Sequence, residues 1–215
     1  TPKPSSAASD VYKRQDTTMP SATRNYAAAI DALNSLQSNS ATIEAIRRSG
    51  KTVNELNEPE MTEYLQRIGH RRDELDRLNV IHITGTKGKG STAAFCDALL
   101  QKARPPGAGK IGLYTSPHMV AARERIRIDG VPISEADFAK FFWEVWDRLE
   151  QNPHRALETT PLRPVYFRFM TILAFHVFIS LEVSATLLEV GIGGMYDSTN
   201  IVPVSYKHLT LPTKA

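Results

Sequence analysis

The sequence predicts an α/β protein in which helices flank a parallel sheet that carries a phosphate-binding loop. Three short apolar segments, at residues 80–83, 110–115 and 185–190, are typical of buried parallel strands. After the first of them comes a glycine-rich turn, followed at once by a helix-forming segment at residues 93–100. A strand that leads through such a turn into a helix is the usual setting of a nucleotide-binding loop.

The glycine-rich turn, residues 85–92, reads Gly-Thr-Lys-Gly-Lys-Gly-Ser-Thr. Its glycines allow backbone N–H groups to turn towards an anion, and the following helix dipole favours the same ligand. Lys89 is expected to reach the β- and γ-phosphates of a nucleotide. The usual motif has Ser or Thr directly after this lysine, whereas here Gly90 intervenes and the hydroxyl comes at Ser91. We therefore expect another metal ligand further along the chain; the alternative is a plain turn with an exposed lysine.

Two residues at strand ends are candidates for that ligand. A right-handed crossover would pair the strand at 80–83 with the strand at 110–115, so Ser116 would lie beside the phosphate loop. Glu189 stands near the end of the apolar strand at 185–190, and a carboxylate at such a place can hold magnesium opposite a phosphate loop. The alternative is a lone glutamate that binds nothing.

Residues 123–130 alternate between charged and apolar side chains with period two, which predicts a strand. Its three arginines would share one face and its two isoleucines the other. The arginine face could be an electropositive strip for an anionic substrate. The residues alone favour the other interpretation, an edge strand with a charged, half-exposed face.

Apolar residues at helical spacing predict the remaining elements. Helices are expected at residues 26–36, 41–46, 61–68, 135–149 and 165–182. The last of them is apolar nearly all round, as expected of a helix buried against a sheet. His176 within it is interpreted as a hydrogen-bonded core residue, because no second ligand recurs one helical turn away. The charged run at 71–77 is interpreted as a solvated face.

The formal charge of +3 and the isoelectric point near 9.0 come from the two ends of the chain. Residues 1–18 and 204–215 carry five basic and two acidic residues, so the rest of the chain is neutral and we expect no nucleic-acid partner. The longest apolar run, at residues 170–181, is shorter than the roughly 20 residues of a membrane span. The single cysteine, Cys96, excludes an intrachain disulfide and fits a reducing compartment.

Five sequence blocks occur in a fixed order along this chain. They are the phosphate loop at 85–92, Thr-Ser-Pro-His at 115–118, the arginine segment at 123–130, Tyr-Phe-Arg-Phe at 166–169, and residues 189–200, which contain Glu-Val-Gly-Ile-Gly-Gly and Asp-Ser-Thr-Asn. No single block is specific. In combination they resemble the folylpolyglutamate synthase family, in its eukaryotic form, within the wider group of Mur-type ATP-dependent amide ligases.

The resemblance implies a Mur-ligase-like ATP-binding domain, truncated here, of which residues 26–202 are the N-terminal part. The flanks at 1–25 and 203–215 look foreign to it, because they lack apolar periodicity and contain stretches similar to translated vector sequence. The family's later Asp-His-Thr block, its carbamylated lysine and its second domain have no counterpart here. We therefore expect an incomplete active site.

The resemblance also implies three groups of site residues. The phosphates of ATP would be held by Gly85, Thr86, Gly88, Lys89, Gly90 and Ser91, with Lys89 also catalytic. Ser116 and Glu189 would bind Mg²⁺. The pocket for the pterin end of the substrate would be formed by Val165, Tyr166, Phe167, Arg168, Tyr196, Asp197 and Ser198, together with Arg125 on a loop that closes over it.

The implied reaction is the ATP-dependent addition of L-glutamate to the γ-carboxyl group of a reduced folate through an acyl phosphate. It requires no protein nucleophile. We expect a monomer in the cytoplasm, with the mitochondrion as a further location. Three alternatives stay open: a dihydrofolate synthase acting on dihydropteroate, a P-loop kinase or regulatory nucleotide-binding module, and an inactive truncated product.

Overall fold

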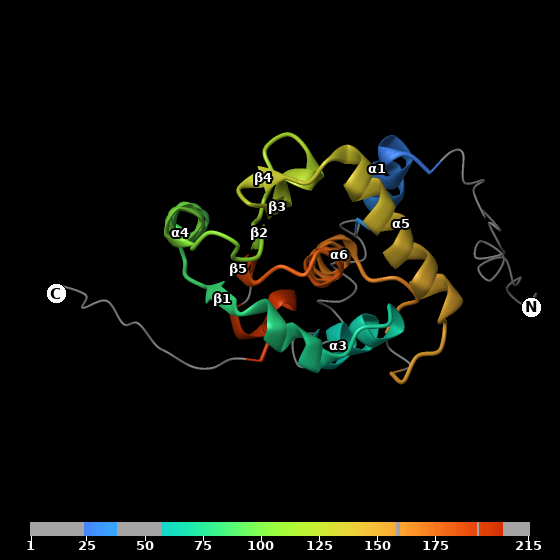
Figure 1. The fold of residues 1–215 in the computed structure, drawn as a ribbon. Helices are drawn as coiled ribbons and strands as arrows, with labels where there is room; N and C mark the ends of the chain where they lie inside the picture. Colours follow the sequence, from blue (N-terminus) through green and yellow to red (C-terminus); the bar gives the residue numbers. More distant parts are fainter. Residues whose placement is uncertain (1–23, 38–56, 158–159, 193, 204–215) are drawn as a thin grey trace, which may run out of the picture.

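The computed structural model describes residues 24–37, 57–157, 160–192 and 194–203 (Figure 1). The helix predicted at 41–46 and nearly all of the two flanks lie outside these residues. The described chain forms one sheet with helices on both faces, which confirms the α/β class predicted from the sequence.

The sheet has five strands in the order β1-β5-β2-β3-β4. They are β1 (Val80–Ile83), β2 (Ile111–Tyr114), β3 (Ile126–Ile128), β4 (Val131–Pro132) and β5 (Ala185–Glu189). Strands β1, β5 and β2 run parallel, whereas β3 and β4 extend the sheet antiparallel on the β2 side. The sheet is therefore mixed, and its parallel part consists of the three strands that were predicted.

Strand β5 lies between β1 and β2, so the predicted direct pairing of these two strands is wrong. The register places Leu188 between His82 of β1 and Tyr114 of β2. Residues 186–189 are all buried, as a central strand covered on both faces requires, whereas β1 at the edge is only partly buried. The end of β5 therefore lies between the ends of the other two parallel strands.

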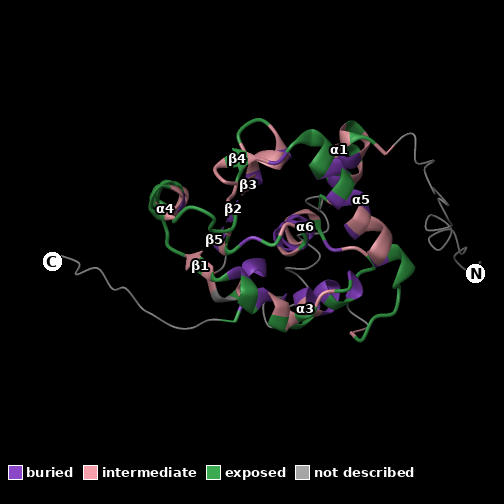
Figure 2. Cartoon of the chain, viewed as in Figure 1, coloured by how far each residue is buried: buried purple, intermediate pink, exposed green. Residues whose placement is uncertain are grey.

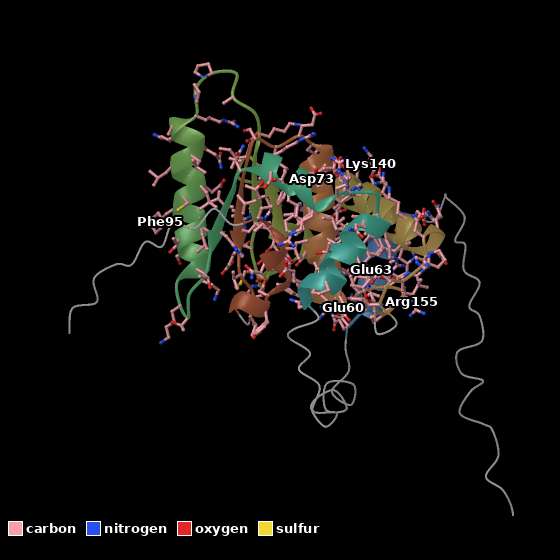
Figure 3. All side chains as sticks on the ribbon, turned by 90° about the horizontal axis from the view of Figure 1, so that it is seen from below. Glu60, Glu63, Asp73, Phe95, Lys140 and Arg155 are labelled. Carbon is pink, nitrogen blue, oxygen red and sulfur yellow. The ribbon has the colours of Figure 1, made fainter. Side chains whose placement is uncertain are left out.

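Helix α4 (Lys89–Ala103) covers one face of the sheet (Figure 1). Its Ala93 packs with Leu187 of β5 in a small apolar cluster, and the free cysteine Cys96 lies partly buried against the same cluster. Phe95 points away from the sheet and is 72% exposed (Figure 3). The inner face of α4 thus holds the phosphate loop on the sheet while its outer face remains apolar and exposed.

Helix α6 (Tyr166–Ser180) lies on the opposite face of the sheet, in the middle of the main core (Figure 2). Every residue from 169 to 178 is buried, which confirms the helix predicted to be apolar all round. It is surrounded by α1 (Tyr26–Ser35), α3 (Asn57–Arg67) and α5 (Glu135–Gln151). None of the helices in the described part of the chain is both long and apolar enough to cross a membrane.

The described connections contain four short 3-10 helices. They are η2 (Arg72–Leu78), η3 (Ala122–Arg125), η4 (Gly194–Tyr196) and η5 (Ser198–Ile201). In η2 the two leucines are buried and the charged side chains face outwards, as predicted for a solvated charged run. Helix α5 begins where predicted, because Ser134 Oγ accepts a hydrogen bond from the N–H of Asp137 at 3.0 Å.

The predicted arginine strand is only partly correct. Its first half forms η3, and only Ile126–Ile128 is extended. Arg123 and Arg127 each donate a hydrogen bond to a backbone carbonyl, and the third arginine, Arg125, is buried. The helical turn breaks the alternation of the faces, so these arginines form no continuous electropositive strip.

His176 is a buried, hydrogen-bonded core residue, as predicted. Its side chain is 1% exposed, and its Nδ1 lies 2.8 Å from Nε2 of His70. Its Nε2 lies 2.8 Å from a carboxylate oxygen of Glu144. The pKa of His176 is lowered to about 4, mainly because burial disfavours the charged imidazolium. A chain of polar side chains therefore crosses the interface between α6 and α5.

Candidate functional site at the ends of the parallel strands

The predicted phosphate loop connects β1 to α4. Gly88 is the N-cap of the helix and has φ of 77°, and Gly85 has φ of 152°, so both occupy backbone conformations that favour glycine. Lys89 is the first helical residue, and its Nζ donates a hydrogen bond to the carbonyl oxygen of Gly85 at 3.0 Å. The lysine thus closes over the loop at the N-terminus of a helix of 15 residues, a position suited to an anion.

Gly90 brings the loop next to the carboxylate of Glu189. A Cβ atom at position 90 would lie 3.4 Å from Oε1 and 3.5 Å from Oε2 of that carboxylate. A larger side chain would fill the space between the loop and the acid. This contact gives a physical reason for glycine at the position where the usual motif has a hydroxyl.

Ser116 lies on the other side of the same carboxylate. Its backbone N–H donates a hydrogen bond to Oε2 of Glu189 at 3.0 Å, and Glu189 is 5% exposed. The structure therefore brings together the two predicted metal ligands, although β1 and β2 are not neighbours. Carboxylate and hydroxyl oxygens are ligands that Mg²⁺ accepts, with water and phosphate oxygens completing its shell.

Within the described ranges, no group of three or more His, Cys, Asp or Glu side chains is arranged to hold a metal ion. A divalent cation at Glu189 and Ser116 would therefore depend on oxygen atoms from a nucleotide or from water. This is the usual situation for magnesium at a phosphate loop.

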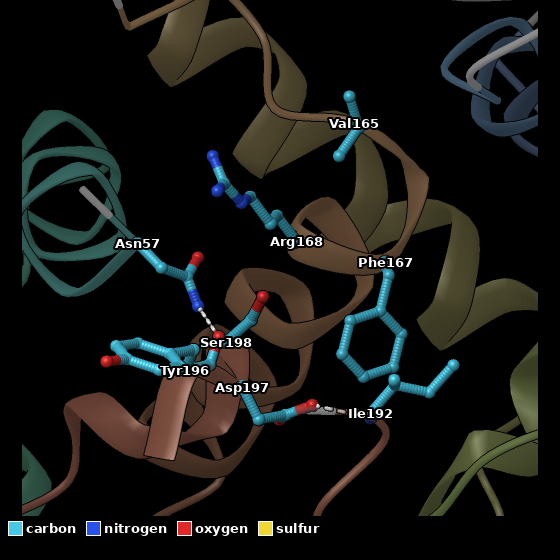
Figure 4. Close-up of a pocket in the computed structure, with 8 residues that line it drawn as sticks. All are labelled: Asn57, Val165, Phe167, Arg168, Ile192, Tyr196, Asp197 and Ser198. Carbon is cyan, nitrogen blue, oxygen red and sulfur yellow. Dashed lines mark hydrogen bonds between the residues drawn. The ribbon is translucent and has the colours of Figure 1, made fainter. Parts of the chain in front are cut away.

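A pocket of about 180 Å³ opens beside the end of β5 (Figure 4). It is lined by Asn57, Val165, Phe167, Arg168, Ile192, Tyr196, Asp197 and Ser198. The lining combines the beginning of α6 with the loop around η4, so the two segments predicted to bind substrate do meet. The pocket begins three residues after Glu189, at Ile192.

The side chain of Asp197 holds the loop around η4 in place through hydrogen bonds. Its Oδ2 accepts hydrogen bonds from the N–H groups of Gly191 and Ile192 at 3.0 and 2.9 Å. Its Oδ1 accepts from the N–H and the hydroxyl of Thr199 at 2.9 and 2.7 Å. Thr199 in turn contacts Nε2 of His82 at 2.8 Å. The carboxylate is 3% exposed and fully engaged, so it fixes the pocket wall.

Arg168 is held by an ion pair with Glu60 of α3. Glu60 is buried, and the side chain of Arg168 is 17% exposed. The pair is formed across the interface between α3 and α6. The guanidinium therefore reaches the pocket with its charge already partnered.

Two predicted substrate residues, Tyr166 and Arg125, do not line the pocket. The Arg125 guanidinium lies 5.4 Å from the ring centroid of Tyr166, in a cation–π contact. Its Nε also donates a hydrogen bond to Nδ1 of His118 at 2.9 Å. Burial, followed by the nearby charge of Arg125, lowers the pKa of His118. These three residues instead connect the loop after β2 to the start of α6.

Two residues that line the pocket were not predicted from the sequence. Asn57 begins α3, and nothing in its neighbourhood distinguishes it from an ordinary polar helix start. Ile192 lies in the 189–200 block, where the sequence gives it no role, yet it is 91% exposed beside the pocket. An apolar residue between glycines at a strand end was the available signal.

No protein-family model matches the chain. Curated relatives include the folylpolyglutamate synthases of Candida albicans, 49% identical over 187 residues, and of Neurospora crassa, 50% identical over 189 residues. These matches cover 83% and 86% of this chain and 36% of each relative. The chain thus spans about a third of the length of the curated relatives that it matches.

The comparison with solved structures also finds folylpolyglutamate synthases. The bifunctional folylpolyglutamate synthase/dihydrofolate synthase from Yersinia pestis is similar with a TM-score of 0.62 and 29% identity, over 86% of this chain and 38% of that one. An FPGS–AMPPCP–folate complex is similar with a TM-score of 0.61 and 28% identity, over 83% of this chain and 38% of that one. The chain therefore matches folylpolyglutamate synthases in sequence and in fold over the part that it shares with them.

Proposed function

We propose that the complete protein that contains this chain is an ATP-dependent amide ligase, which adds L-glutamate to the γ-carboxyl group of a reduced folate. The observation that carries this proposal is the position of β5. Its last residue, Glu189, lies against the phosphate loop, and the segment that follows lines the pocket. A nucleotide on the loop and a ring in the pocket would meet at one strand end. The similarity to a synthase solved with AMPPCP and folate supports these two ligands.

On the nucleotide side, the backbone of Gly85, Thr86, Gly88, Gly90 and Ser91 would surround the phosphates of ATP. Lys89 would give up its hydrogen bond to the Gly85 carbonyl and would contact the β- and γ-phosphates instead. Glu189 and Ser116 would hold Mg²⁺, which supplies positive charge to the transferred phosphoryl group when it is bound. The buried carboxylate beside Gly90 supports this assignment.

On the substrate side, the pocket would take the flat pterin ring. Val165, Phe167 and Tyr196 offer apolar contact surface, and Asp197 holds the wall in place. The glutamate tail would then extend past Gly191 towards the phosphate loop. The protein backbone at Gly191 packs closely against Phe167, because a Cβ atom at position 191 would lie 2.5 Å from the Phe167 ring.

The reaction places a phosphoryl group on the γ-carboxylate, and the amine of glutamate then displaces phosphate to form the amide. In this chain, Lys89 and the loop N–H groups would stabilise the negative charge on the phosphoryl group as it moves. The part contributed by these residues is positioning and electrostatic stabilisation, and no side chain forms a covalent bond with substrate.

The test measures ADP release by the complete protein. ADP should form only when ATP, a reduced folate and L-glutamate are all present, with one amide formed for each ADP. Equal ADP release without folate would contradict the proposal. A phosphorylated acceptor that persists without amide formation would indicate a kinase instead.

A second candidate is dihydrofolate synthesis, because one of the similar solved proteins is a bifunctional synthase. Dihydropteroate carries a carboxylate but no glutamate tail, so both acceptors would present a carboxylate to the same loop. Comparing dihydropteroate with tetrahydrofolate as acceptor separates the two activities.

We also propose that the described residues form the first part of an ATP-binding domain within a monomer. Its expected location is the cytoplasm, with the mitochondrion as a further option. Size-exclusion chromatography and fractionation of cells that express the complete protein test these two points.

A further inference from the structure

The chain that follows β5 is attached to β1 at two points. We call its described residues, 190–192 and 194–199, the strand-end segment. At its start, the N–H of Val190 donates a hydrogen bond to the carbonyl oxygen of Ile83 at 3.0 Å. At its end, Oγ1 of Thr199 lies 2.8 Å from Nε2 of His82. Both contacts are therefore made by consecutive residues of β1, the strand that continues into the phosphate loop.

The alternation of β1 explains why His82 can make this contact. Ile83 packs towards the small cluster under α4, whereas Val80 packs against the main core on the opposite face. Since side chains two residues apart share a face, His82 lies on the same face as Val80. It is the one polar side chain of the four in β1. Its partner Thr199, in η5, is fully buried.

The hydrogen bonds of Thr199 determine which atom is the donor. The Thr199 hydroxyl has one hydrogen, which it donates to Oδ1 of Asp197 at 2.7 Å. The hydroxyl oxygen can then only accept from His82, so Nε2 of His82 carries a hydrogen. Burial lowers the pKa of His82, an effect that the Asp197 carboxylate opposes only in part. The ring is therefore neutral at pH 7, with its hydrogen on Nε2.

The hydrogen bonds continue from Asp197 back to the end of β5. Its Oδ2 accepts from the N–H groups of Gly191 and Ile192, two and three residues after the acid that faces the phosphate loop (Figure 4). Without the His82 donor, the contact of Val190 with Ile83 would remain, but the far end of the strand-end segment would lose its side-chain hydrogen bond to β1.

We propose that His82 is a positioning residue for the reaction, because through Thr199 it holds the strand-end segment against the strand that carries the phosphate loop. This inference rests on the proposed function, in which a phosphoryl group on that loop must meet a carboxylate delivered past this segment. A small displacement between two reacting groups lowers the rate even when each ligand still binds.

The kinetic test compares the complete protein with His82→Leu, which removes the donor. With ATP, tetrahydrofolate and L-glutamate all saturating, kcat for amide formation should fall about tenfold while the KM for ATP stays within about threefold. His82→Gln places an amide N–H near the position of Nε2 and should restore kcat to within about threefold. The proposal is overturned if His82→Leu keeps its kcat, if the KM for ATP rises as much as kcat falls, or if glutamine restores nothing.

A double-mutant cycle tests the link itself. Thr199→Val removes the partner hydroxyl, and it replaces His82→Leu as the test if that variant does not fold. Its kcat should also fall at least about tenfold, and the combined variant should lose no more than Thr199→Val alone, because both changes break one link. Losses that multiply would overturn the proposal. His70→Leu is the matched control, since it removes a ring hydrogen bond to His176 and should keep kcat within about threefold.

Hydrogen exchange without any ligand separates this inference from the proposed function. The N–H groups of Gly191 and Ile192 should exchange about tenfold faster in His82→Leu than in the unaltered protein, because the segment is held less firmly. Unchanged exchange would overturn the role of His82. If the unaltered protein forms no amide, the proposed function fails, and the exchange rates still decide whether His82 holds the segment.

Discussion

Gly90 of the phosphate loop and Glu189 of β5 lie so close that a methyl group at position 90 would touch both carboxylate oxygens. The two residues are 99 positions apart in the sequence, and the contact exists because β5 pairs directly with β1. The loop and the acid therefore face one another with room between them for no more than a small group. Three of the predictions below concern this strand end and the segment that follows it.

Gly90→Ala should separate folding from ligand binding. Position 90 lies in the first turn of α4, where alanine is favoured over glycine by up to about 1 kcal/mol. We therefore expect the free energy of unfolding to stay constant or rise slightly in urea titrations. The methyl group would occupy the gap in front of Glu189, so ATP affinity in the presence of Mg²⁺ should fall at least about tenfold. Unchanged affinity in calorimetry would show that the gap holds no part of the nucleotide complex.

Lys89→Ala should weaken ATP binding strongly, by about 100-fold, because the lysine is the positive side chain at the start of α4. Lys87→Ala is the matched control, since Lys87 lies in the same exposed loop but is not the lysine assigned to the phosphates. That control should stay within about threefold of the unaltered protein by the same measurement. Equal effects of the two variants would remove the special role of Lys89.

Asp197→Asn should loosen the pocket and leave the phosphate loop intact. An asparagine has only one side-chain oxygen. Its NH₂ group would therefore face N–H groups that now donate hydrogen bonds to a carboxylate oxygen, either those of Gly191 and Ile192 or that of Thr199. Unpaired buried donors should lower the free energy of unfolding by about 1–3 kcal/mol. Folate affinity should fall while ATP affinity changes little; an equal loss of both would indicate general unfolding.

The pair of His70 and His176 should make stability depend on pH. Both have a lowered pKa because they are buried, and that of His176 is about 4. The unfolded chain binds protons at a pKa near 6.5, so stability is complete above that value and is lost as the pH falls towards 4. For His176 alone the loss is on the order of 3 kcal/mol. Urea titrations between pH 4 and pH 7 measure it.

His176→Asn is the variant for that experiment, and His154→Asn at an exposed loop position is its control. The first should flatten the dependence of unfolding free energy on pH, and the second should leave it unchanged. The same slope in both variants would assign the pH dependence to other groups.

The sequence correctly predicted the structural features that depend on residues close together in the chain. The glycine-rich turn between β1 and α4, the start of α5 at residue 135 and the buried helix α6 follow from residue type and spacing within one segment. These features are specified over short distances along the chain.

Features that depend on long-range contacts could not be predicted. The insertion of β5 between β1 and β2 depends on pairing between strands that lie far apart in the sequence. The 3-10 turn at η3 replaces part of a segment whose alternation fits a strand equally well. Asn57 becomes a pocket residue only because α3 packs against α6 and η5, so no pattern in its own segment marks it.

The short distance from Glu189 to Asp197 along the chain has an energetic consequence. Glu189 lies against the phosphate loop and Ile192, Tyr196 and Asp197 line the pocket, so we expect that ordering one site orders part of the other. Under the proposed function, thermodynamic linkage requires any such effect to be mutual: the factor by which a bound nucleotide changes folate affinity equals the factor by which folate changes nucleotide affinity. The alignment of three parallel strand ends thus joins the two proposed sites through one short segment of chain.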